Sequence, residues 1–208
     1  MGLLKRLLSC IVVCSCVLLI TCEIPASDTP ASDTSSDSDE DNGDEGPQTY
    51  SLRDTGPAGG LIFYVNPNTN VDGWTYLEAA PQSTEWTGKQ WADVLSFIDG
   101  ADGYAIGTGE QNTSDIVADL GAGCCYAAQL CYELTYGGYD DWFLPSWEEL
   151  NKMYINLHQH SVGGFTAAVY WSSSESNLFF ARSQDFDDGS QAASFKTFST
   201  RVRAARAF

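Results

Sequence analysis

Positive charge is scarce in this sequence. Its 208 residues include ten lysines and arginines against 28 aspartates and glutamates, so the net charge is −18 and the isoelectric point lies near 4.1. A nucleic-acid-binding protein needs a basic surface that displaces counterions, so we expect no nucleic-acid partner. Long apolar runs are scarce too. Residues 7–20 form an apolar run of 14 residues. As a helix this run spans about 21 Å, less than the roughly 30 Å hydrocarbon core of a bilayer. This excludes a membrane protein that crosses the bilayer many times.

The motifs of common catalytic and cofactor sites are also missing. No Ser-His-Asp arrangement, glycine-rich phosphate loop or dinucleotide fingerprint is present. The two histidines, His158 and His160, are two positions apart, which places them on different faces of a helix rather than together on a metal ion. We therefore expect no enzyme activity, no cofactor and no metal site.

Charge and aromatic residues divide the chain into three segments. Residues 1–22 contain no acid, residues 23–47 contain nine acids and no base, and residues 48–208 contain nineteen acids and eight bases. All 26 phenylalanines, tryptophans and tyrosines lie in 48–208. Only this last segment can bury a sizeable core, and its length suits one globular domain.

The first segment, 1–22, has the pattern of an export signal. Lys5 and Arg6 precede the apolar run, as in the charged start of a signal peptide. Its end, Leu-Ile-Thr-Cys at 19–22, resembles the lipobox of bacterial lipoproteins. That resemblance implies that Cys22 is lipidated and becomes the new N-terminus, so that the acyl chains attach the protein to a membrane. Cys16 is a second candidate for this role, and secretion without a lipid, or a retained anchor, is the alternative.

The second segment, 23–47, is predicted to be a disordered tether. It contains the tandem repeat Pro-Ala-Ser-Asp-Thr at 25–34 and then a run of Ser, Asp, Glu and Gly. Such a composition cannot bury enough apolar surface to offset its ordering entropy, and its like charges extend it. A spacer that lifts the domain off a membrane is the interpretation we favour, and a weak calcium-binding tail is the alternative.

Within 48–208, patterns of both helix and strand are present. Residues 59–65 and 74–79 are predicted strands that form a hairpin with a long loop. Predicted helices follow at 90–99, 113–120 and 124–134. A strand at 141–144 precedes a helix that begins with a capping box, Ser146 with Glu149.

The remainder is predicted to be β structure. Strands are expected at 169–173, 178–186 and 192–198, with a turn at 187–190, and the chain ends in an arginine-rich strand at 201–208. Helices early and strands late indicate an α+β fold, a single domain with a mixed or antiparallel sheet and a few helices.

Several motifs in this segment resemble one family. They are GGLIFYV at 59–65, GWTYLEAAP at 73–81, IGTG at 106–109, GGYDDWFLPS at 137–146, YWSSS at 170–174, and the VRA and RAF of 202–208. Together they are similar to the C-terminal domain of bacterial collagen-like adhesins, the Lcl C-terminal domain family. This resemblance implies an exported, surface-attached protein that binds sulfated glycosaminoglycans. The final Val-Arg-Ala pattern is more loosely similar to C-type-lectin-like folds.

The sequence departs from the type member in its stalk and in its charge. It has no Gly-X-Y collagen repeat, and its domain is acidic, whereas a polyanion requires focused positive charge. Arg201, Arg203 and Arg206 form the one arginine cluster, so they are the candidate residues for an anionic ligand. For Asp140 and Asp141 we favour a structural role, in which they cap backbone amides or pair with Arg203 or Arg206 and so fix the last strand in place.

Six tryptophans are many for this length, and aromatic faces stack on sugar rings. Trp86, in a polar stretch, and Trp147, in the first turn of a helix, are the two that we expect to be exposed and to bind ligand. The acids at 140 and 141 with Trp142 are a second possible sugar site.

Residues 185–189 are interpreted as a plain hairpin turn, and a calcium site there is the alternative. Cys124, Cys125 and Cys131 are an odd set, and we expect no disulfide framework from them.

We therefore predict a lipid-anchored protein of the outer membrane or cell surface, with a noncatalytic adhesion-type domain that binds carbohydrate or glycosaminoglycan. Two other functions stay open: an envelope assembly protein that binds other proteins, and a glycan-active enzyme with Glu148 and Asp140 as paired carboxylates. The sequence does not indicate an oligomeric state.

Overall fold

The computed structural model describes residues 48–93, 95–121 and 125–208. The export signal, Cys22 and the acidic tether lie outside these residues. All of the described residues belong to one compact unit.

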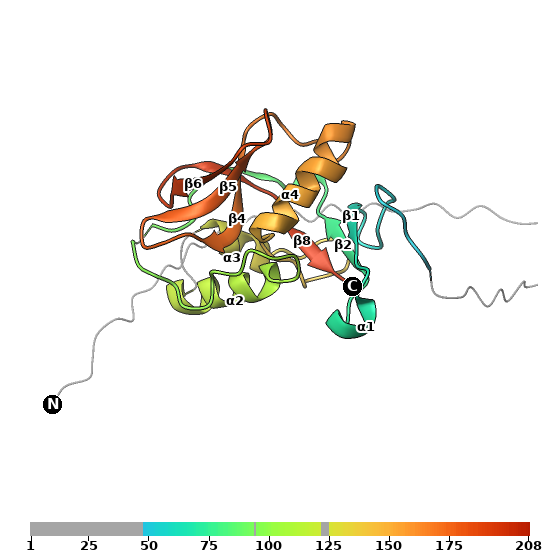
Figure 1. Ribbon diagram of the computed structural model, residues 1–208, viewed down its shortest axis with the longest axis horizontal. Helices are drawn as coiled ribbons and strands as arrows, with labels where there is room; N and C mark the ends of the chain where they lie inside the picture. Colours follow the sequence, from blue (N-terminus) through green and yellow to red (C-terminus); the bar gives the residue numbers. More distant parts are fainter. Residues whose placement is uncertain (1–47, 94, 122–124) are drawn as a thin grey trace, which may run out of the picture. The chain divides into compact units, whose positions relative to one another are not determined.

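A small antiparallel sheet joins the two ends of the domain. Strands β1 (Leu61–Val65) and β2 (Tyr76–Ala79) form the predicted hairpin, whose loop carries the one-turn helix α1 (Thr69–Asp72). The C-terminal strand β8 (Ala205–Ala207) pairs with β2 on its other side, so the order is β1-β2-β8. Figure 1 shows β8 beside this hairpin.

A second sheet of five strands has the order β3-β7-β4-β5-β6. These strands are β3 (Trp86–Lys89), β4 (Val169–Glu175), β5 (Phe180–Asp185), β6 (Gln191–Phe195) and β7 (Thr200–Val202). The β4–β7 pair is parallel and the other pairs are antiparallel, so this sheet is mixed. One mixed sheet, one antiparallel sheet and a few helices confirm the α+β prediction.

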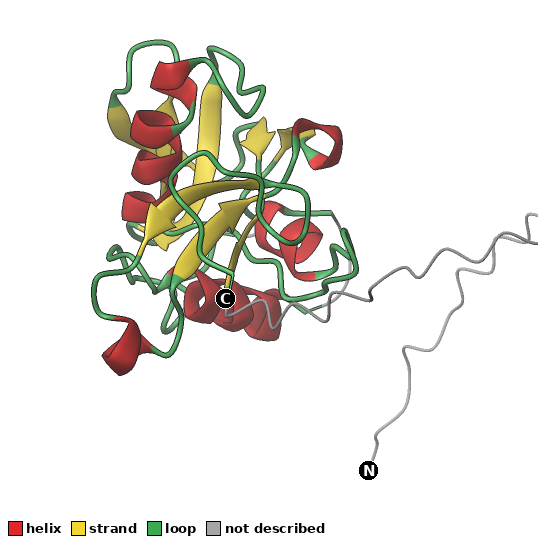
Figure 2. Ribbon diagram, turned by 90° about the vertical axis from the view of Figure 1, so that its right-hand side faces the viewer, coloured by secondary structure: helices red, strands yellow, loops and turns green. Residues whose placement is uncertain are grey.

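Three longer helices pack around the sheets (Figure 2). They are α2 (Gly109–Leu120), α3 (Ala127–Tyr132) and α4 (Trp147–Asn156), and two short 3-10 turns are η1 (Gln82–Thr84) and η2 (His158–His160). The capping box of α4 is present as predicted: the Ser146 hydroxyl accepts the Glu149 N–H, and the Glu149 carboxylate accepts the Ser146 N–H. Within the described ranges, no helix is both long enough and apolar enough to cross a membrane.

The prediction of a helix at 90–99 was wrong. Trp91 and Ile98 are buried as its apolar pattern required, but Leu95 is exposed and the segment is irregular. Its backbone bonds to distant groups instead of to itself, because Trp91 N–H donates to the Lys196 carbonyl and Ile98 N–H to the Glu175 carboxylate. These tertiary hydrogen bonds replace the helical ones.

Other boundaries also differ from the prediction. The single strand expected at 201–208 is divided into β7 and β8, which belong to different sheets. The helix expected at 124–134 covers only 127–132 within the described residues. The strand expected at 141–144 is reduced to one bridge, in which Phe143 pairs with Ala205 of β8. Phe143 and Ala205 exchange two backbone hydrogen bonds of 2.8 and 2.9 Å, so this short segment still ties the domain's middle to its last strand.

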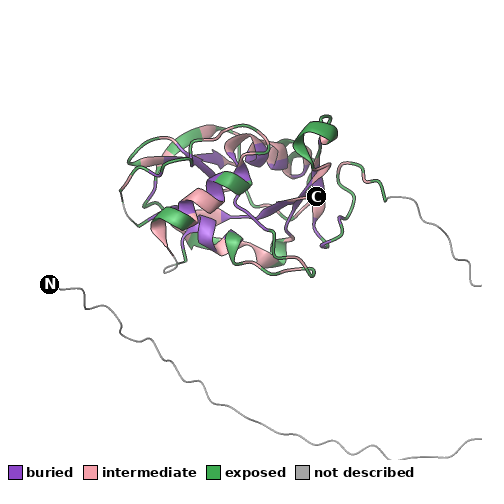
Figure 3. Ribbon diagram, turned by 90° about the horizontal axis from the view of Figure 1, so that it is seen from below, coloured by how far each residue is buried: buried purple, intermediate pink, exposed green. Residues whose placement is uncertain are grey.

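The core consists of two apolar clusters. One gathers around the buried rings of Trp91, Trp142 and Trp171, and the other around Phe63, Tyr170 and Phe186 with the apolar face of α4. Figure 3 shows buried positions concentrated along the strands, whereas the helices expose one side. Burial of this kind contributes roughly 1.5–3 kcal/mol for each large apolar side chain.

Candidate functional site

The structure places Arg203 and Arg206 in the interior. Their exposed fractions are 1% and 3%, and their charges are already neutralised. Arg203 binds Glu85 at 2.5 Å and also donates to the carbonyls of Ala80 and Gly163. The prediction that these two arginines bind a ligand was therefore wrong, because a buried guanidinium in an ion pair has no surface to offer.

Arg206 pairs with Asp141, as in the structural role that we favoured from the sequence. Its Nε and Nη2 each donate to one oxygen of Asp141, both at 2.8 Å, and Nη1 lies 3.4 Å from Glu78. Burial by itself lowers the pKa of a guanidinium, but hydrogen bonds and charges from Asp141 and Glu78 outweigh it, so the pKa of Arg206 is raised. This pairing fixes β8 to the loop before α4.

Arg201, on β7, keeps part of its side chain exposed. Its Nη1 lies 2.6 Å from Glu85, the same carboxylate that binds Arg203. Tyr170 also donates its hydroxyl to Glu85 at 3.0 Å. The three arginines of the cluster are thus tied to Glu85, Glu78 and Asp141, and they form no open basic patch.

Both Trp86 and Trp147 are half-buried rather than exposed. The side chain of Trp86 packs against the first core cluster. The ring of Trp147 lies edge-on to Tyr104, with centroids 5.3 Å apart, and the guanidinium of Arg182 lies 4.6 Å from its centroid. Such a cation–π contact is a stabilising use of the ring.

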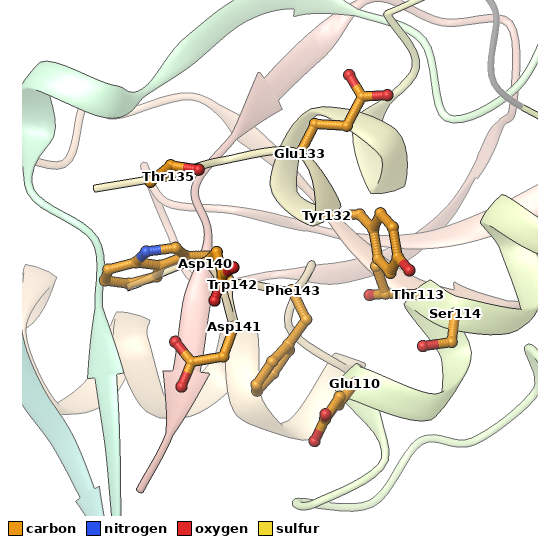
Figure 4. A pocket seen from close by; sticks show the side chains of 10 residues that line it. All are labelled: Glu110, Thr113, Ser114, Tyr132, Glu133, Thr135, Asp140, Asp141, Trp142 and Phe143. Carbon is orange, nitrogen blue, oxygen red and sulfur yellow. The ribbon is translucent and has the colours of Figure 1, made fainter. Parts of the chain in front are cut away.

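A cavity of about 480 Å³ lies between α2, α3 and the loop that leads into α4. Figure 4 shows its lining side chains, which come from these three segments. They are Glu110, Thr113, Ser114, Tyr132, Glu133, Thr135, Asp140, Asp141, Trp142 and Phe143. We call this the acidic cavity, and its volume falls in the range of small-molecule sites, about 300–1,000 Å³.

Local sequence explains how α2 contributes to the acidic cavity. Glu110, Thr113 and Ser114 are spaced i, i+3 and i+4, so they share one helix face. The Thr113 hydroxyl already makes hydrogen bonds within the fold: it donates to the Gly109 carbonyl and accepts the Leu144 N–H. This bond fixes the wall of the cavity.

Four carboxylates and no base line the acidic cavity. Asp141 is held by Arg206, and Glu133 accepts a hydrogen bond from Gln129 at 2.8 Å. The carboxylates of Glu110 and Asp140 are exposed and have no hydrogen-bond partner among the described residues. The site therefore offers acceptors to a ligand rich in hydroxyl or amino donors, and it repels anions.

Tyr132 supplies the open aromatic surface of the acidic cavity. It ends α3, is 52% exposed, and lies near Thr113 and Ser114 in Figure 4. Trp142, which the sequence suggested for a sugar site, lines the cavity but is 2% exposed, with its ring in the core. Sequence reasoning found Asp140 and Asp141 but missed Tyr132 and Glu110; the helical spacing at 110, 113 and 114 was the available signal.

A second cavity, of about 620 Å³, is more apolar. Phe198, Val169 and Ala168 line it together with hydroxyls and Arg201. Because the Arg201 charge is paired with Glu85, this cavity has fewer free polar groups with which to orient a ligand. The acidic cavity is therefore the better candidate site.

Among the described residues, Glu149 is the one carboxylate with a strongly perturbed pKa, and it has a structural role. Burial raises its pKa to about 7, against backbone hydrogen bonds from Ser146, Gly107 and Gly109 that lower it. Its oxygens accept the Gly107 and Ser146 N–H groups at 2.7 Å each, which joins the loop before α2 to the start of α4. It has no exposed surface and lines none of the cavities described above.

The other candidates from the sequence lie outside these two cavities. Residues 187–190 form the predicted turn, in which Asp185 and Asp188 accept nearby backbone N–H groups. Cys125 and Cys131 are free thiols, and burial raises the pKa of Cys131. Across the described part of the chain, no three His, Cys, Asp or Glu side chains are arranged to hold a metal ion.

No protein-family model matches the chain, and no curated protein matches it. Among solved structures, the fold is similar to that of a fimbrial protein from Bacteroides ovatus ATCC 8483, with a TM-score of 0.50 and 15% sequence identity. The match covers 72% of this chain but only 44% of that protein, so the chain spans less than half of its length. At this identity the likeness is one of fold.

Proposed function

We propose that this chain is a lipid-anchored, surface-displayed protein whose domain binds uncharged carbohydrate in the acidic cavity without transforming it. The observation that carries the proposal is the combination of Tyr132 with the unpaired carboxylates of Glu110 and Asp140. An aromatic face stacks on the apolar side of a sugar ring, and carboxylates accept hydrogen bonds from its hydroxyls.

Four further features support display at the cell surface. The lipobox-like end of the leader at Cys22 supplies the anchor, and the acidic stretch at 23–47 supplies the spacer. Several motifs of residues 59–208 resemble those of Lcl C-terminal domains, which occur in exported adhesins, and the structure similar in fold is a fimbrial protein. All of these agree with a binding role outside the cell.

Sulfated glycosaminoglycans are not the ligand that we propose. The arginines that would bind sulfate are paired with carboxylates, and the acidic cavity repels anions. Glycan cleavage is also outside the proposal: Glu148, considered as a partner for Asp140, does not line the acidic cavity.

The test is an array of neutral oligosaccharides probed with the detergent-solubilised full chain. Tyr132→Ala removes the stacking face, and Asp140→Asn removes one acceptor charge. Phe97→Ala is a matched control, since Phe97 is 59% exposed but lies outside the cavity. We expect saturable binding by the wild type and the control, and a loss of about tenfold or more for Tyr132→Ala, equal to roughly 1.4 kcal/mol. Equal binding by the wild type, Phe97→Ala and Tyr132→Ala would contradict the proposed site.

A further inference from the structure

Strand β6 is the last strand of the five-stranded sheet, and within the described residues no strand pairs with its outer side (Figure 1). Its register with β5 shows which backbone groups face outward. Just before β6, Ser190 O accepts the Asp185 N–H at 2.9 Å, and just after it, Lys196 N–H donates to Phe179 O at 3.0 Å. Even-numbered residues therefore bond to β5, and odd-numbered ones turn their N–H and C=O groups away.

The outward groups belong to Gln191, Ala193 and Phe195. In the described part of the chain, the Phe195 carbonyl has a partner, the Phe198 N–H at 2.8 Å, but the backbone groups of Ala193 and Gln191 have none on this side. Ala192 and Ala193 are exposed, and small side chains leave room for another backbone to approach. An edge of this kind is a template for one more strand.

This edge also lacks the charges that normally protect an edge strand. Between Gly189 and Thr200 the only charged residue is Lys196, and it is fully buried with its ammonium on Glu175. Large exposed apolar side chains lie along the edge of β6: Phe195 is 45% exposed and Phe198 54%, with ring centroids 5.3 Å apart. Leu178 and Phe179, in the neighbouring β4–β5 turn, are exposed as well.

We propose that two copies of this chain associate through β6, as antiparallel strands about a two-fold axis. The outward groups fix the register. Ala193 lies opposite Ala193 of the second copy, and Gln191 lies opposite Phe195 of the second copy. Every paired residue then turns its N–H toward the second copy, and the carbonyls of Gln191 and Ala193 are free to accept, whereas that of Phe195 already accepts the Phe198 N–H. Because the same strand serves both copies, one surface suffices and the assembly closes as a dimer.

The self-complementary backbone pattern and the lack of exposed charge along β6 favour a second copy as the occupant. Residues 48–208 carry nineteen acids against eight bases, so two copies repel each other over most of their surfaces. The β6 edge avoids part of this repulsion, because residues 189–200 expose no charge and their backbone pattern complements itself. A basic protein partner would instead be drawn to the acidic faces of the domain.

Cysteine crosslinking of the full chain in membranes tests this register. In the proposed dimer the two Ala193 Cα atoms lie about 5.5 Å apart, within the range of a disulfide. Ala193→Cys should therefore give a disulfide-linked homodimer under mild oxidation. Ala192→Cys is the matched control, because residue 192 lies opposite 194 of the second copy, which offsets the two cysteines. Wild type controls for the native cysteines.

A several-fold larger dimer band for Ala193→Cys than for Ala192→Cys supports the proposal. Equal bands, or crosslinking of Ala193→Cys to a different protein, would overturn it. As a second measurement, Ala193→Lys places like charges opposite each other at an exposed position. It should reduce the protein mass per detergent-solubilised particle from two chains to one, and an unchanged mass would also overturn the proposal. Glycan binding is measured at a separate surface, so its failure would leave this test unaffected.

Discussion

Arg206 clamps Asp141 with two parallel hydrogen bonds of 2.8 Å, although the two residues are 65 positions apart in the chain. Asp141 lies at the wall of the acidic cavity, and Arg206 lies in the C-terminal strand β8. One ion pair therefore holds both the last strand and one side of the candidate site. It also leads us to expect that the arginine-rich C-terminus does not bind polyanions.

Replacing Arg206 with methionine should destabilise the domain by about 3–5 kcal/mol, because the buried Glu78 loses its compensating charge. Asp141→Asn should cost less, since Asp141 is 44% exposed and water can replace part of the interaction. Urea unfolding of the purified variants measures both. If Arg206→Met were the milder change, the assigned structural role would be wrong.

Heparin should not bind this protein at physiological salt. Each arginine of the 201–206 cluster already has a carboxylate partner, and the domain as a whole is acidic. In heparin affinity chromatography the wild type should elute without retention, and Arg201→Ala should behave identically. Retention that Arg201→Ala abolishes would show that the partly exposed Arg201 binds sulfate after all.

Stability should fall as the pH rises from 5 to 8, through the titration of Glu149. Its pKa in the folded domain is about 7, above its ordinary value of 4.5, so the folded state binds the proton more tightly. The stabilisation is therefore complete below about pH 4.5 and is lost as the pH rises through 7, to a total of about 3 kcal/mol.

Glu149→Gln, which stays neutral, should be less stable than the wild type at pH 5. Both oxygens of the Glu149 side chain accept hydrogen bonds from backbone N–H groups, and in the variant the amide NH₂ replaces one of these acceptors. It should also lose less stability between pH 5 and pH 8. Urea midpoints at both pH values test this, and equal losses in the two proteins would exclude Glu149 as the source.

Cys22→Ala should release the protein from the membrane. If Cys22 carries the lipid, as its lipobox-like context predicts, the variant lacks the acyl chains whose burial contributes about 0.8 kcal/mol per methylene. Labelling cells with a fatty-acid probe and then fractionating them measures this. Equal labelling of the wild type and the variant would show that Cys22 does not carry the lipid.

Local patterns predicted much of the fold. The α4 capping box depends on residues three positions apart, and the β1–β2 hairpin on two apolar runs with one loop between them. In both cases the partners are close in the sequence, so their spacing reveals the contact. The pairing of Asp141 with Arg206 was also among the favoured interpretations, from the chemistry of the two side chains.

The features that the sequence did not predict depend on contacts between residues far apart in the chain. The segment at 90–99 has a helical apolar pattern, but Lys196 and Glu175 take its backbone groups. Arg201 and Arg203 gained their structural role from Glu85, more than 110 positions away. Tyr132 entered the candidate site because α3 ends beside α2, which no local pattern indicates. A cluster of arginines in the sequence therefore did not become a cluster of free charges.

Equilibrium binding of a neutral oligosaccharide, with recovery of the sugar afterwards, tests the central claim most directly. We expect saturable binding by the wild type and Phe97→Ala, at least a tenfold loss in Tyr132→Ala, and recovery of the sugar unchanged. Binding that does not depend on Tyr132, or a sugar that returns cleaved, would contradict a noncatalytic carbohydrate site in the acidic cavity.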